Sequence, residues 1–395
     1  MRVCMLAYAF YESDTRIMQY ATALADRGDS VDVIALRRSG SLPFEVLEGV
    51  NVYRIQARER NERSRFDYLI RILRFFFAAA MLLTRKHLSC PYRVLHIHSV
   101  PDFLVFAALV PKLLGAQIIL DIHDILPEFY SSKFDVSTNS LPFKFLVLVE
   151  KLSIAFSDHV IIANHLWHER LVSRSVRSDK CTTFINYPDL RIFYPRPKAS
   201  LNSRFLITYP GTLSTHQGLD VAIRAFAKVA DKMPKARFDI YGDGPAEASL
   251  RQLTVELGLS RRVIFHHCLP VREIADVMAC SDLAVVPKRA SSVFGNEAAS
   301  TKIMQFMSLG VPVVVSRTKI DTACHDESRV KFFKSEDESD LASAILLLYQ
   351  NPQLREQLAA NGLRYVQDNS WQEKKRDYLK LIDGLGSLEN CAHGS

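Results

Sequence analysis

The residues best suited to chemistry in this sequence are Glu297, Lys302 and Gln305, within the segment F-G-N-E-A-A-S-T-K-I-M-Q-F-M-S-L-G-V-P-V-V-V-S. The pattern predicts a loop around Glu297 and then a helix that carries Lys302 and Gln305. Gly310 and Pro312 would end that helix, and the apolar run after them predicts a buried parallel strand. A loop followed by a helix N-terminus offers backbone N–H groups and the positive end of the helix dipole. The segment is therefore predicted to bind an anionic ligand.

A histidine in the first half of the chain could serve the same ligand. His123 stands in the run D-I-H-D, directly after the apolar residues 117–122. A histidine just beyond a strand end can donate a hydrogen bond to a phosphate oxygen or a sugar hydroxyl. The plainer alternative is a histidine that makes a structural hydrogen bond. The run could also suggest metal ligands, but no second cluster completes such a site, and no metal is expected.

Glycines mark a second place where a phosphate could bind. Gly211 and Thr212 follow an apolar strand pattern, and their backbone amides could hold a diphosphate. Lys302 is the best candidate to offset the diphosphate charge, with Lys288 or Arg289 in support. The run G-D-G-P further on lacks the G-x-G-x-x-G spacing of a dinucleotide fingerprint, so it predicts only a strand-to-helix turn.

These residues need a scaffold, and the sequence predicts two domains that each alternate strand and helix. The first half has strand patterns at 3–9, 30–36, 94–98, 117–122 and 159–163. The second half restarts with patterns at 205–209, 236–241, 263–266, 283–287 and 311–316. Both periods are interrupted near 195–201 by P-R-P-K-A-S-L. Such alternation predicts two parallel Rossmann-type α/β domains, 1–195 and 202–368, with a ligand between the carboxyl ends of the two sheets.

Length and composition agree with this prediction. A chain of 395 residues suggests two to three domains. Apolar residues make up 48% and charged residues 24%, which is typical of a soluble α/β protein. The seven cysteines are scattered without a C-x-x-C pair, which predicts reduced thiols in a cytosolic protein.

The positive charge of the chain is concentrated in one segment. The formal net charge is +7, and residues 51–100 hold ten Lys and Arg against three acids. Within that window the apolar run 66–83 predicts an amphipathic helix. The run is too short, and its arginines lie too centrally, for a transmembrane span.

Two interpretations of this basic helix stay open. It could pack on the sheet of the first domain with its arginines exposed. Alternatively, it could lie in the surface of an anionic membrane, and the run 58–86 carries basic residues on both sides of it, namely Arg58, Arg60, Arg63, Arg65, Arg85 and Lys86. The three consecutive phenylalanines at 75–77 favour the membrane, because one groove would hardly hide them all. Nucleic acid is not expected as a partner, because no recognised binding motif accompanies the charge.

Several lines of the sequence, in order and with the right gaps, resemble the GT-B glycosyltransferases of family 4 over essentially the whole chain. In the first half these lines are Y-E-S-D-T-R-I-M-Q-Y, H-I-H-S-V-P-D, L-D-I-H-D-I-L-P-E and I-N-Y-P-D. In the second half they are Y-P-G-T-L-S-T-H-Q-G-L-D, I-Y-G-D-G-P and the segment around Glu297. The bacterial members that build exopolysaccharide or O-antigen units are the most similar.

The resemblance implies roles for individual residues. His123 and Glu297 would be catalytic, with His123 facing the donor sugar and phosphate and Glu297 facing the sugar hydroxyls. The donor-binding residues would be Gly211, Thr212, Asn296, Lys302, Ile303 and Gln305, and the acceptor-side residues would be Asp14, Arg16 and His98. Gln305 stands where the family has its second acid, and the basic residues that the family often has near Thr212 and Gln217 are missing.

The resemblance also implies a fold and a reaction. The fold would be GT-B, with two Rossmann-like domains facing each other across a cleft and a last helix, 369–385, packed back on the first domain. The reaction would be a retaining hexosyl transfer from a nucleoside diphosphate sugar, without a metal or other cofactor. The acceptor would be a saccharide or lipid-linked, at the cytoplasmic face of the membrane, in cell-surface polysaccharide synthesis. Two alternatives remain, namely a sugar-nucleotide epimerase and a catalytically impaired nucleotide-sugar-binding or scaffold protein.

Overall fold

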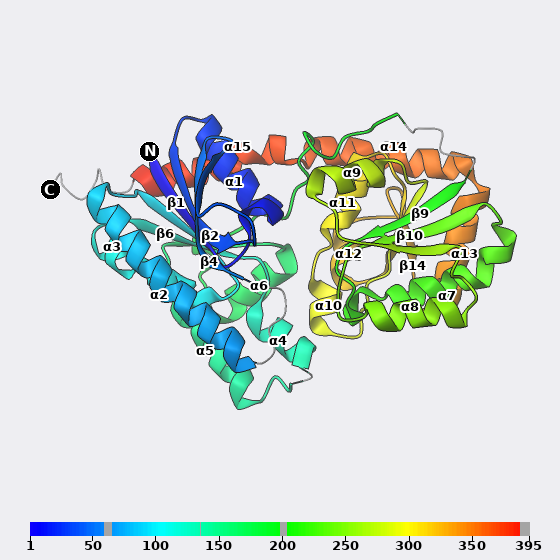
Figure 1. The fold of residues 1–395 in the computed structure, drawn as a ribbon, viewed down its shortest axis with the longest axis horizontal. Coiled ribbons are helices and arrows are strands. Elements are labelled where there is room, and N and C mark those ends of the chain that lie inside the picture. The colour runs from blue at the N-terminus through cyan, green and yellow to red at the C-terminus, as the bar shows by residue number, and fades with distance from the viewer. Residues whose placement is uncertain (59–64, 135, 198–203, 388–395) are drawn as a thin grey trace. The chain divides into compact units, whose positions relative to one another are not determined.

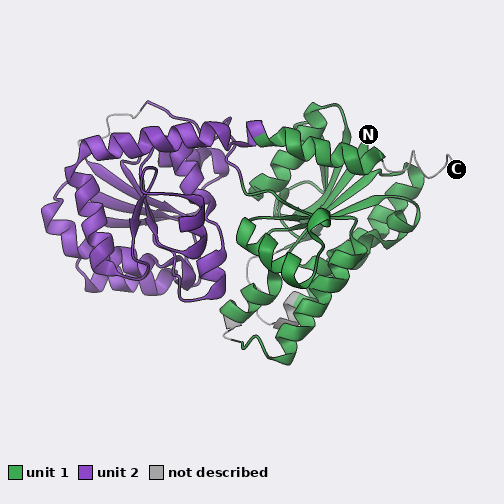
Figure 2. Cartoon of the chain, turned by 180° about the vertical axis from the view of Figure 1, so that it is seen from behind, with its two compact units in different colours: residues 1–186, 374–395 green, residues 187–373 purple. Residues whose placement is uncertain are grey.

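The computed structural model describes residues 1–58, 65–134, 136–197 and 204–387, and it has an α/β architecture (Figure 1). The chain divides into two compact units, one made of 1–186 with 374–395 and the other of 187–373 (Figure 2). The sequence placed this division near 195–201, whereas residues from Tyr187 onward already group with the second unit. Each unit is built around its own sheet.

The first unit contains an eight-stranded sheet in the order β3-β4-β2-β1-β5-β6-β7-β8. Neighbouring strands are parallel except β3 and β4, which form an antiparallel pair at one edge. The strands are β1 (Arg2–Ala7), β2 (Ser30–Arg37), β3 (Phe44–Leu47), β4 (Val50–Ala57), β5 (Val94–His98), β6 (Gln117–Ile122), β7 (His159–Ile162) and β8 (Cys181–Thr183).

Burial explains why the central strands of this sheet are so apolar. Every residue of β5 is buried, and in β1 and β6 only the first residue is partly exposed. Parallel strands are covered by helices on both faces, so an apolar run is expected. His96, His98 and Asp121 break that rule, because they are polar and fully buried in β5 and β6. A polar cluster at this depth needs internal partners, which are described below.

The helices of the first unit follow the strands in sequence. They are α1 (Thr15–Asp26), α2 (Arg65–Ser89), α3 (Leu109–Leu113), α4 (Leu126–Phe134), α5 (Leu141–Phe156) and α6 (His165–Arg174), with short 3-10 turns at η1 (Tyr11–Ser13), η2 (Asp102–Ala108) and η3 (Ser178–Lys180). Asp14 caps α1, because its carboxylate accepts hydrogen bonds from the backbone N–H groups of Arg16 and Ile17. The last helix, α15 (Trp371–Ser387), buries Tyr378 and Ile382 completely, and residues from Lys374 onward belong to this unit.

The second unit has a six-stranded, fully parallel sheet in the order β11-β10-β9-β12-β13-β14. Its strands are β9 (Phe205–Pro210), β10 (Ala236–Tyr241), β11 (Val263–His266), β12 (Leu283–Val286), β13 (Val313–Ser316) and β14 (Lys331–Phe333). Its helices are α7 (Leu219–Val229), α8 (Glu247–Glu256), α9 (Val271–Ala279), α10 (Val293–Glu297), α11 (Thr301–Ser308), α12 (Lys319–Cys324), α13 (Glu338–Gln350) and α14 (Pro352–Asp368), with 3-10 turns at η4 (Thr215–Gln217) and η5 (Ala230–Lys232). The apolar sides of α7 and α13 pack on β9 and β10 in the core of this unit.

The prediction of two Rossmann-like α/β domains is confirmed, and the buried strand after Gly310 is β13. Two local features differ from the sequence prediction. Glu297 ends the short helix α10 rather than lying in a loop, because Ser292 caps this helix by accepting a hydrogen bond from the Gly295 N–H. The strand pair β3–β4 was not predicted, because the buried face of β4 carries Arg54 and Gln56 beside Val50 and Val52, which breaks the apolar alternation of a strand.

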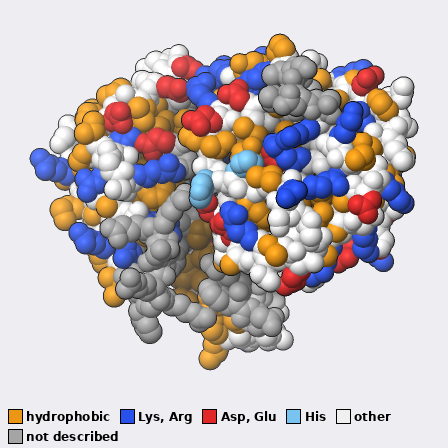
Figure 3. Space-filling model, turned by 45° about the vertical axis from the view of Figure 1, so that its right-hand side comes forward, with side chains coloured by type: hydrophobic (Ala, Val, Ile, Leu, Met, Phe, Trp, Pro, Cys, Tyr) orange, Lys and Arg blue, Asp and Glu red, His pale blue; other side chains and the backbone are white. Residues whose placement is uncertain are grey.

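Some predictions concern residues outside those described. Arg60, Arg63 and the tail 388–395 lie there, and for Arg65 only the backbone is described. None of the described helices combines the length and the apolar character that a bilayer crossing requires. Hydrophobic and basic side chains lie interspersed over the face of the molecule seen in Figure 3.

Candidate active site

In the first unit, the predicted acceptor-side residues and His123 gather at the carboxyl edge of the sheet. Parallel strands all end at the same edge, so the residues that follow them become neighbours. Ala7 at the end of β1 pairs with His98 at the end of β5, and His98 pairs with Asp121 of β6. His123 comes directly after β6.

Arg16 connects this group to the rest of the unit through hydrogen bonds. It is buried, and it donates two hydrogen bonds of 2.8 Å to Asp121, from Nε to Oδ2 and from Nη2 to Oδ1. Its remaining donor reaches the carbonyl oxygen of Phe184 at 2.7 Å and the side-chain oxygen of Asn186 at 3.0 Å. Burial alone would raise the pKa of Asp121, but the Arg16 charge and the neighbouring His123 hold that pKa well below its usual range. Arg16 is therefore committed to the protein's own structure.

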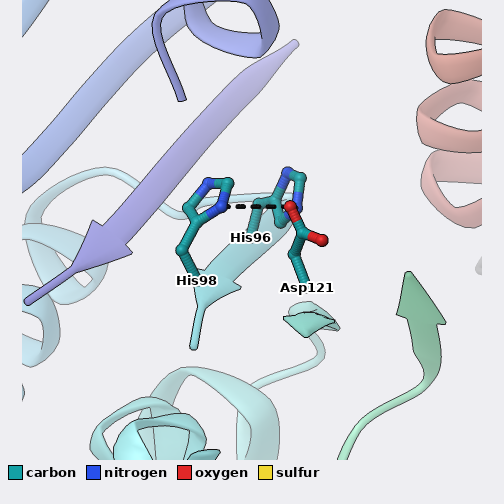
Figure 4. A group of neighbouring side chains, drawn as sticks. All are labelled: His96, His98 and Asp121. Atoms are coloured by element: carbon teal, nitrogen blue, oxygen red, sulfur yellow. Dashed lines mark ion pairs between the residues drawn. The ribbon is translucent and has the colours of Figure 1, made fainter. Parts of the chain in front are cut away.

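Three histidine rings surround the same carboxylate. Figure 4 shows His96 and His98 converging on Asp121 from β5. Oδ2 of Asp121 lies 3.2 Å from Nδ1 of His98 and 3.6 Å from Nε2 of His96, and the two rings stack with centroids 4.2 Å apart. Burial lowers the pKa of both histidines, that of His98 well below its usual value, so both rings are neutral at physiological pH.

The atoms of His96, His98 and Asp121 are close enough together to suggest a metal site. Each could contribute one ligand atom, and these atoms lie within 4.8 Å of one another. However, the Asp121 carboxylate already holds the Arg16 guanidinium on both of its oxygens. A cation placed there would lie beside a buried positive charge, so the donor set suits an arginine better than a metal ion.

His123 differs from the other two histidines because it reaches the surface. Its side chain is 19% exposed, and its Nε2 lies 3.3 Å from Oδ2 of Asp121 and 3.1 Å from Nδ1 of His98. Its other nitrogen, Nδ1, lies 3.8 Å from Oδ2 of Asp14. Burial would lower the pKa of His123, but the charges of Asp121 and Asp14 outweigh it and raise that pKa above the usual value. A protonated His123 can donate from both ring nitrogens.

In the second unit, the predicted phosphate loop follows β9. The Gly211 N–H donates to the carbonyl oxygen of Tyr241 at 2.8 Å, so this amide is used within the protein and does not point at a phosphate. Gly242 packs directly on this loop, since a Cβ there would lie 2.0 Å from the Gly211 carbonyl oxygen. Gly211 therefore matters for its missing side chain, and Thr212 next to it is exposed.

Lys302 lies across Gly211. A Cβ on Gly211 would lie 2.4 Å from Cε of Lys302 and 3.0 Å from its Nζ. The ammonium also lies 5.2 Å from the centre of the Tyr209 ring and 3.5 Å from Oε1 of Gln217. Burial, together with the charge of Lys288, lowers the pKa of Lys302 to about 8. A lysine with a neutral amide and an aromatic face around it can gain much from an anionic ligand.

Lys288 and Arg289, expected to support Lys302, are engaged elsewhere. Lys288 is buried, lies 3.0 Å from Oδ2 of Asp321 and donates to the Ala298 carbonyl. Arg289 forms ion pairs with two acids, Asp220 at 2.5 Å and Glu336 at 2.6 Å. Lys288 thus holds the backbone directly after Glu297 through the Ala298 carbonyl, whereas the Arg289 side chain is used by the Thr215 carbonyl and by acids outside α10.

Glu297 lies at the end of α10 with only 6% of its surface exposed. Its Oε1 lies 3.4 Å from Nζ of Lys319, and the Lys319 backbone N–H donates to Oδ1 of Asn296 at 2.7 Å. Lys319 is itself 57% exposed, so this ion pair is partly open to water. The Glu297 carboxylate is therefore held by Lys319. The hydrogen bond from Lys319 to Asn296 also joins the segment after β13 to α10.

The other predicted donor-side residues occupy α11. Ile303 is completely buried, so its side chain contributes to the core and only its backbone could contact a ligand. Gln305 is half-buried. Sequence reasoning did not single out Asp121, Tyr209, Gln217 or Lys319. Asp121 could have been found, because an aspartate inside an apolar strand next to His123 needs an internal partner.

Two family models match the chain, one in each unit. A family model described as a glycosyl transferase 4-like domain matches residues 13–186, and one described as glycosyl transferases group 1 matches residues 192–365. The gpi3 subunit of phosphatidylinositol N-acetylglucosaminyltransferase from Schizosaccharomyces pombe is 22% identical, over 95% of this chain and 78% of its own length.

Solved structures share the fold over almost the whole chain. Sucrose-phosphate synthase from Thermosynechococcus elongatus has a TM-score of 0.77 at 18% identity, covering 98% of this chain and all of that one, 100%. Anabaena Alr3699/HepE, in complex with UDP and glucose, has a TM-score of 0.74 at 16% identity, covering 97% of this chain and 100% of its own.

The position of Lys302 over Gly211 predicts that Gly211→Ala displaces the ammonium and weakens binding of a nucleoside diphosphate, with UDP as the first probe, by about tenfold or more, the worth of one charge-assisted hydrogen bond. Isothermal titration calorimetry measures this. Gly28→Ala is the matched control, because Gly28 also has a positive φ, +94 against +141, but nothing lies within 4 Å of its Cβ position. Equal UDP affinity in Gly211→Ala and the parent would contradict the placement of Lys302.

The pKa of Lys302, about 8, predicts a pH-dependent affinity for UDP. Below that pH the ammonium is charged, so affinity should be highest there and should fall as the pH rises through and beyond about 8. The UDP phosphates are already fully ionised in this range. Lys302→Arg should bind with little change across the same range, since arginine keeps its charge. The same decline in Lys302→Arg would show that another group titrates.

Proposed function

The chain belongs to the GT-B glycosyltransferases of family 4 type, which use nucleotide sugars, and on that premise we propose that it is a retaining hexosyltransferase acting on a lipid-linked acceptor. The observation that carries the transferase part is Lys302, whose ammonium lies over Gly211 where a donor diphosphate would bind, while the retaining stereochemistry rests on the resemblance to family 4. The donor chemistry needs such a group, because the leaving diphosphate gains negative charge as the sugar departs.

In the proposed reaction the acceptor hydroxyl attacks the face from which the diphosphate leaves. The bond between the anomeric carbon and the diphosphate oxygen breaks, and a bond from that carbon to the acceptor oxygen forms. The acceptor proton passes to the leaving diphosphate, so no protein base is needed. Lys302 stabilises the charge on the leaving group, and Glu297 orients the sugar hydroxyls. For His123 the resemblance to family 4 implies a hydrogen bond to the substrate.

Gln305 is the reason to keep a second candidate function. At this position the family has an acid that would accept hydrogen bonds from the nucleotide ribose. Glutamine can still accept and donate, but a neutral bond has roughly half the strength of a charge-assisted one. The alternative is therefore a protein that binds a nucleotide sugar without transferring it. Glu297 and Lys302, which are expected to orient the sugar and to stabilise the leaving group, are both present, and this favours the enzyme.

The proposed acceptor is lipid-linked because the first unit has a surface suited to a membrane. On α2 the side chains of Ile70, Phe77 and Met81 are 63%, 65% and 73% exposed. α2 packs beside α3 and η2, and α5 also packs on η2. Leu113 of α3 and Phe145 of α5 are exposed as well. Large apolar side chains gathered in this way on neighbouring helices are typical of an interaction surface.

The charges on these helices fit an anionic lipid surface. Among the described side chains of α2, α3 and α5, every charged residue that is not buried is basic, namely Arg71, Arg74, Arg85, Lys86, Lys112, Lys144 and Lys151. The single acid, Glu150, is buried and paired with Arg174. A bilayer with anionic headgroups satisfies both features at once.

This surface supports a peripheral location at the inner face of the cell membrane. There, we propose, the protein acts in the synthesis of a cell-surface polysaccharide. The S. pombe relative is named for transfer to phosphatidylinositol, which is itself a lipid acceptor.

The transfer reaction is tested in two steps. First, a panel of UDP-, GDP- and other nucleotide sugars is screened for a rise in Tm, because a ligand of the folded state stabilises it by mass action. The stabilising donor is then supplied with lipid extracts, and the anomeric configuration of the product is read by nuclear magnetic resonance. Retention is expected, and inversion would contradict the mechanism.

Glu297→Gln should lower transfer by roughly two to three orders of magnitude, as for one positioned group in an active site, with little change in Tm. Glu327→Gln, an exposed acid of the same unit paired with Arg317, is the matched control and should keep its activity. If a nucleotide sugar binds to the parent protein but no transfer occurs, the enzyme is contradicted and the non-catalytic alternative is supported.

The membrane surface predicts that Arg74→Gln with Arg85→Gln lowers partitioning onto anionic liposomes by about thirtyfold at low salt, since each basic residue contributes about 1 kcal/mol. Phe77→Ser with Met81→Ser should lower it at low and at high salt, because apolar insertion is not screened. Val255→Ser is the control, an exposed apolar residue of the second unit. Equal sedimentation of all variants with liposomes would leave α2 as an ordinary surface helix.

A further inference from the structure

The environment of His123 is more ordered than a hydrogen-bond donor alone would require. One oxygen, Oδ2 of Asp121, lies within 2.8 Å of Arg16 Nε, 3.2 Å of His98 Nδ1 and 3.3 Å of His123 Nε2. The nitrogens of His98 and His123 lie 3.1 Å from each other. The inner side of the His123 ring is therefore held by two partners at once.

This arrangement fixes the direction of the ring. Because Nε2 of His123 faces Asp121 and His98, Nδ1 faces the other way. Nδ1 lies 3.8 Å from Oδ2 of Asp14, which is too long for a good hydrogen bond but leaves room for an oxygen that contacts both. The Asp14 carboxylate is itself held in place as the cap of α1. Only the Nδ1 side of the ring is thus available to a substrate.

The proton count follows from the carboxylate of Asp121, whose pKa is held well below its usual range. The ionised Asp121 carboxylate can only accept hydrogen bonds, so Nε2 of His123, 3.3 Å from Oδ2, carries a proton. Nδ1 of the neutral His98 lies 3.2 Å from the same oxygen and donates to it, which helps to fix its position. A further proton on Nδ1 of His123 makes this ring an imidazolium.

The charges around the ring favour that imidazolium. The groups that face it are Arg16 and Asp14 from the first helix, His96 and His98 from β5, Asp121 from β6 and Asp124 just after it. The two histidines of β5 are neutral, and burial raises the pKa of Asp124. Arg16 balances one carboxylate, Asp121, and leaves the charge of Asp14. One positive charge on His123 completes the balance.

We infer that Asp121 and His98 are positioning residues for His123, which hold its ring with Nε2 inward and keep it an imidazolium, so that Nδ1–H is offered to an oxygen of the substrate. The inference rests on the proposed role of His123 in the transfer reaction. It adds that the donor is a cation, and that its charge is set by residues that never touch the substrate.

The test is a pH titration of the full chain with isotope-labelled histidine rings, followed by nuclear magnetic resonance without substrate. His123→Gln identifies the resonance of His123. In the parent, His123 should titrate above the value of an unperturbed histidine, about 6.5. Above that pH its neutral ring should keep the proton on Nε2. Since no substrate is present, a failed transfer assay and a failed titration are separate results.

Two variants probe the positioning residues. Asp121→Asn should move the His123 titration to lower pH, but it leaves the buried Arg16 without its ion pair and could prevent folding. His98→Phe is the second variant, because phenylalanine keeps the ring contacts of His98 with His96 and Tyr20 while removing the nitrogen. It should also shift the His123 titration, because the nitrogen that helps to fix the Asp121 oxygen is lost.

Asp32→Asn is the matched control. Asp32 is likewise buried in the first unit, 2% exposed, and paired with Arg2 at 3.1 Å and Lys86 at 3.3 Å. It should lower Tm and leave His123 unmoved. The inference is overturned if His123 of the parent titrates at or below the unperturbed value. It is equally overturned if His123 is unmoved in His98→Phe when that variant is folded.

Discussion

The buried ion pair between Arg16 and Asp121 is the interaction on which the first unit depends. It joins the first helix to a central strand and, through Phe184 and Asn186, to the last segment of the unit before the chain leaves it. Removing one partner of such a pair costs about 3–5 kcal/mol, because the other charge stays buried alone. The pair also provides the carboxylate around which three histidines are arranged, so stability and chemistry share one set of atoms.

In the second unit, close backbone contacts at glycines, rather than a buried ion pair, fix the turns near the candidate site. Three glycines bring its turns so close together that a side chain would collide with a carbonyl oxygen. A Cβ on Gly218 would lie 2.0 Å from the Pro287 carbonyl oxygen, and one on Gly242 would lie 2.0 Å from that of Gly211. A Cβ on Gly244 would lie 2.2 Å from the Leu213 carbonyl oxygen. Gly242 and Gly244 thereby bring the turn after β10 against the turn after β9. Lys302, entering from another helix, then supplies the charge that the loop amide cannot, because that amide is already bonded to Tyr241.

The two units therefore share an architecture but divide the chemistry. The first offers a buried polar network with one exposed ring, and the second offers a lysine with no acid bound to it in the described contacts and a carboxylate held by Lys319. Arg289 and Lys288 show why counting basic residues is not enough. Both are near the site in sequence, yet each is neutralised by acids of its own unit. Surface charge follows a different rule, since among the described side chains of α2 and α5 the exposed charged residues are all basic.

The sequence by itself determined the architecture, because apolar runs of strand length alternate with amphipathic helices and that period is a local property. It also singled out His123, Glu297 and Lys302, since their neighbours along the chain form recognisable motifs. It missed the strand pair β3–β4, whose pattern is weaker.

Only the tertiary structure decided which groups act together. Asp121 meets Arg16, and Lys302 meets Gly211, across separations in sequence that no local pattern encodes. The same is true of the amide of Gly211 and of the side chain of Ile303, which the fold turns to structural use. The physical reason is that burial and pairing depend on which strands end side by side, and that neighbourhood exists only once the sheet has formed.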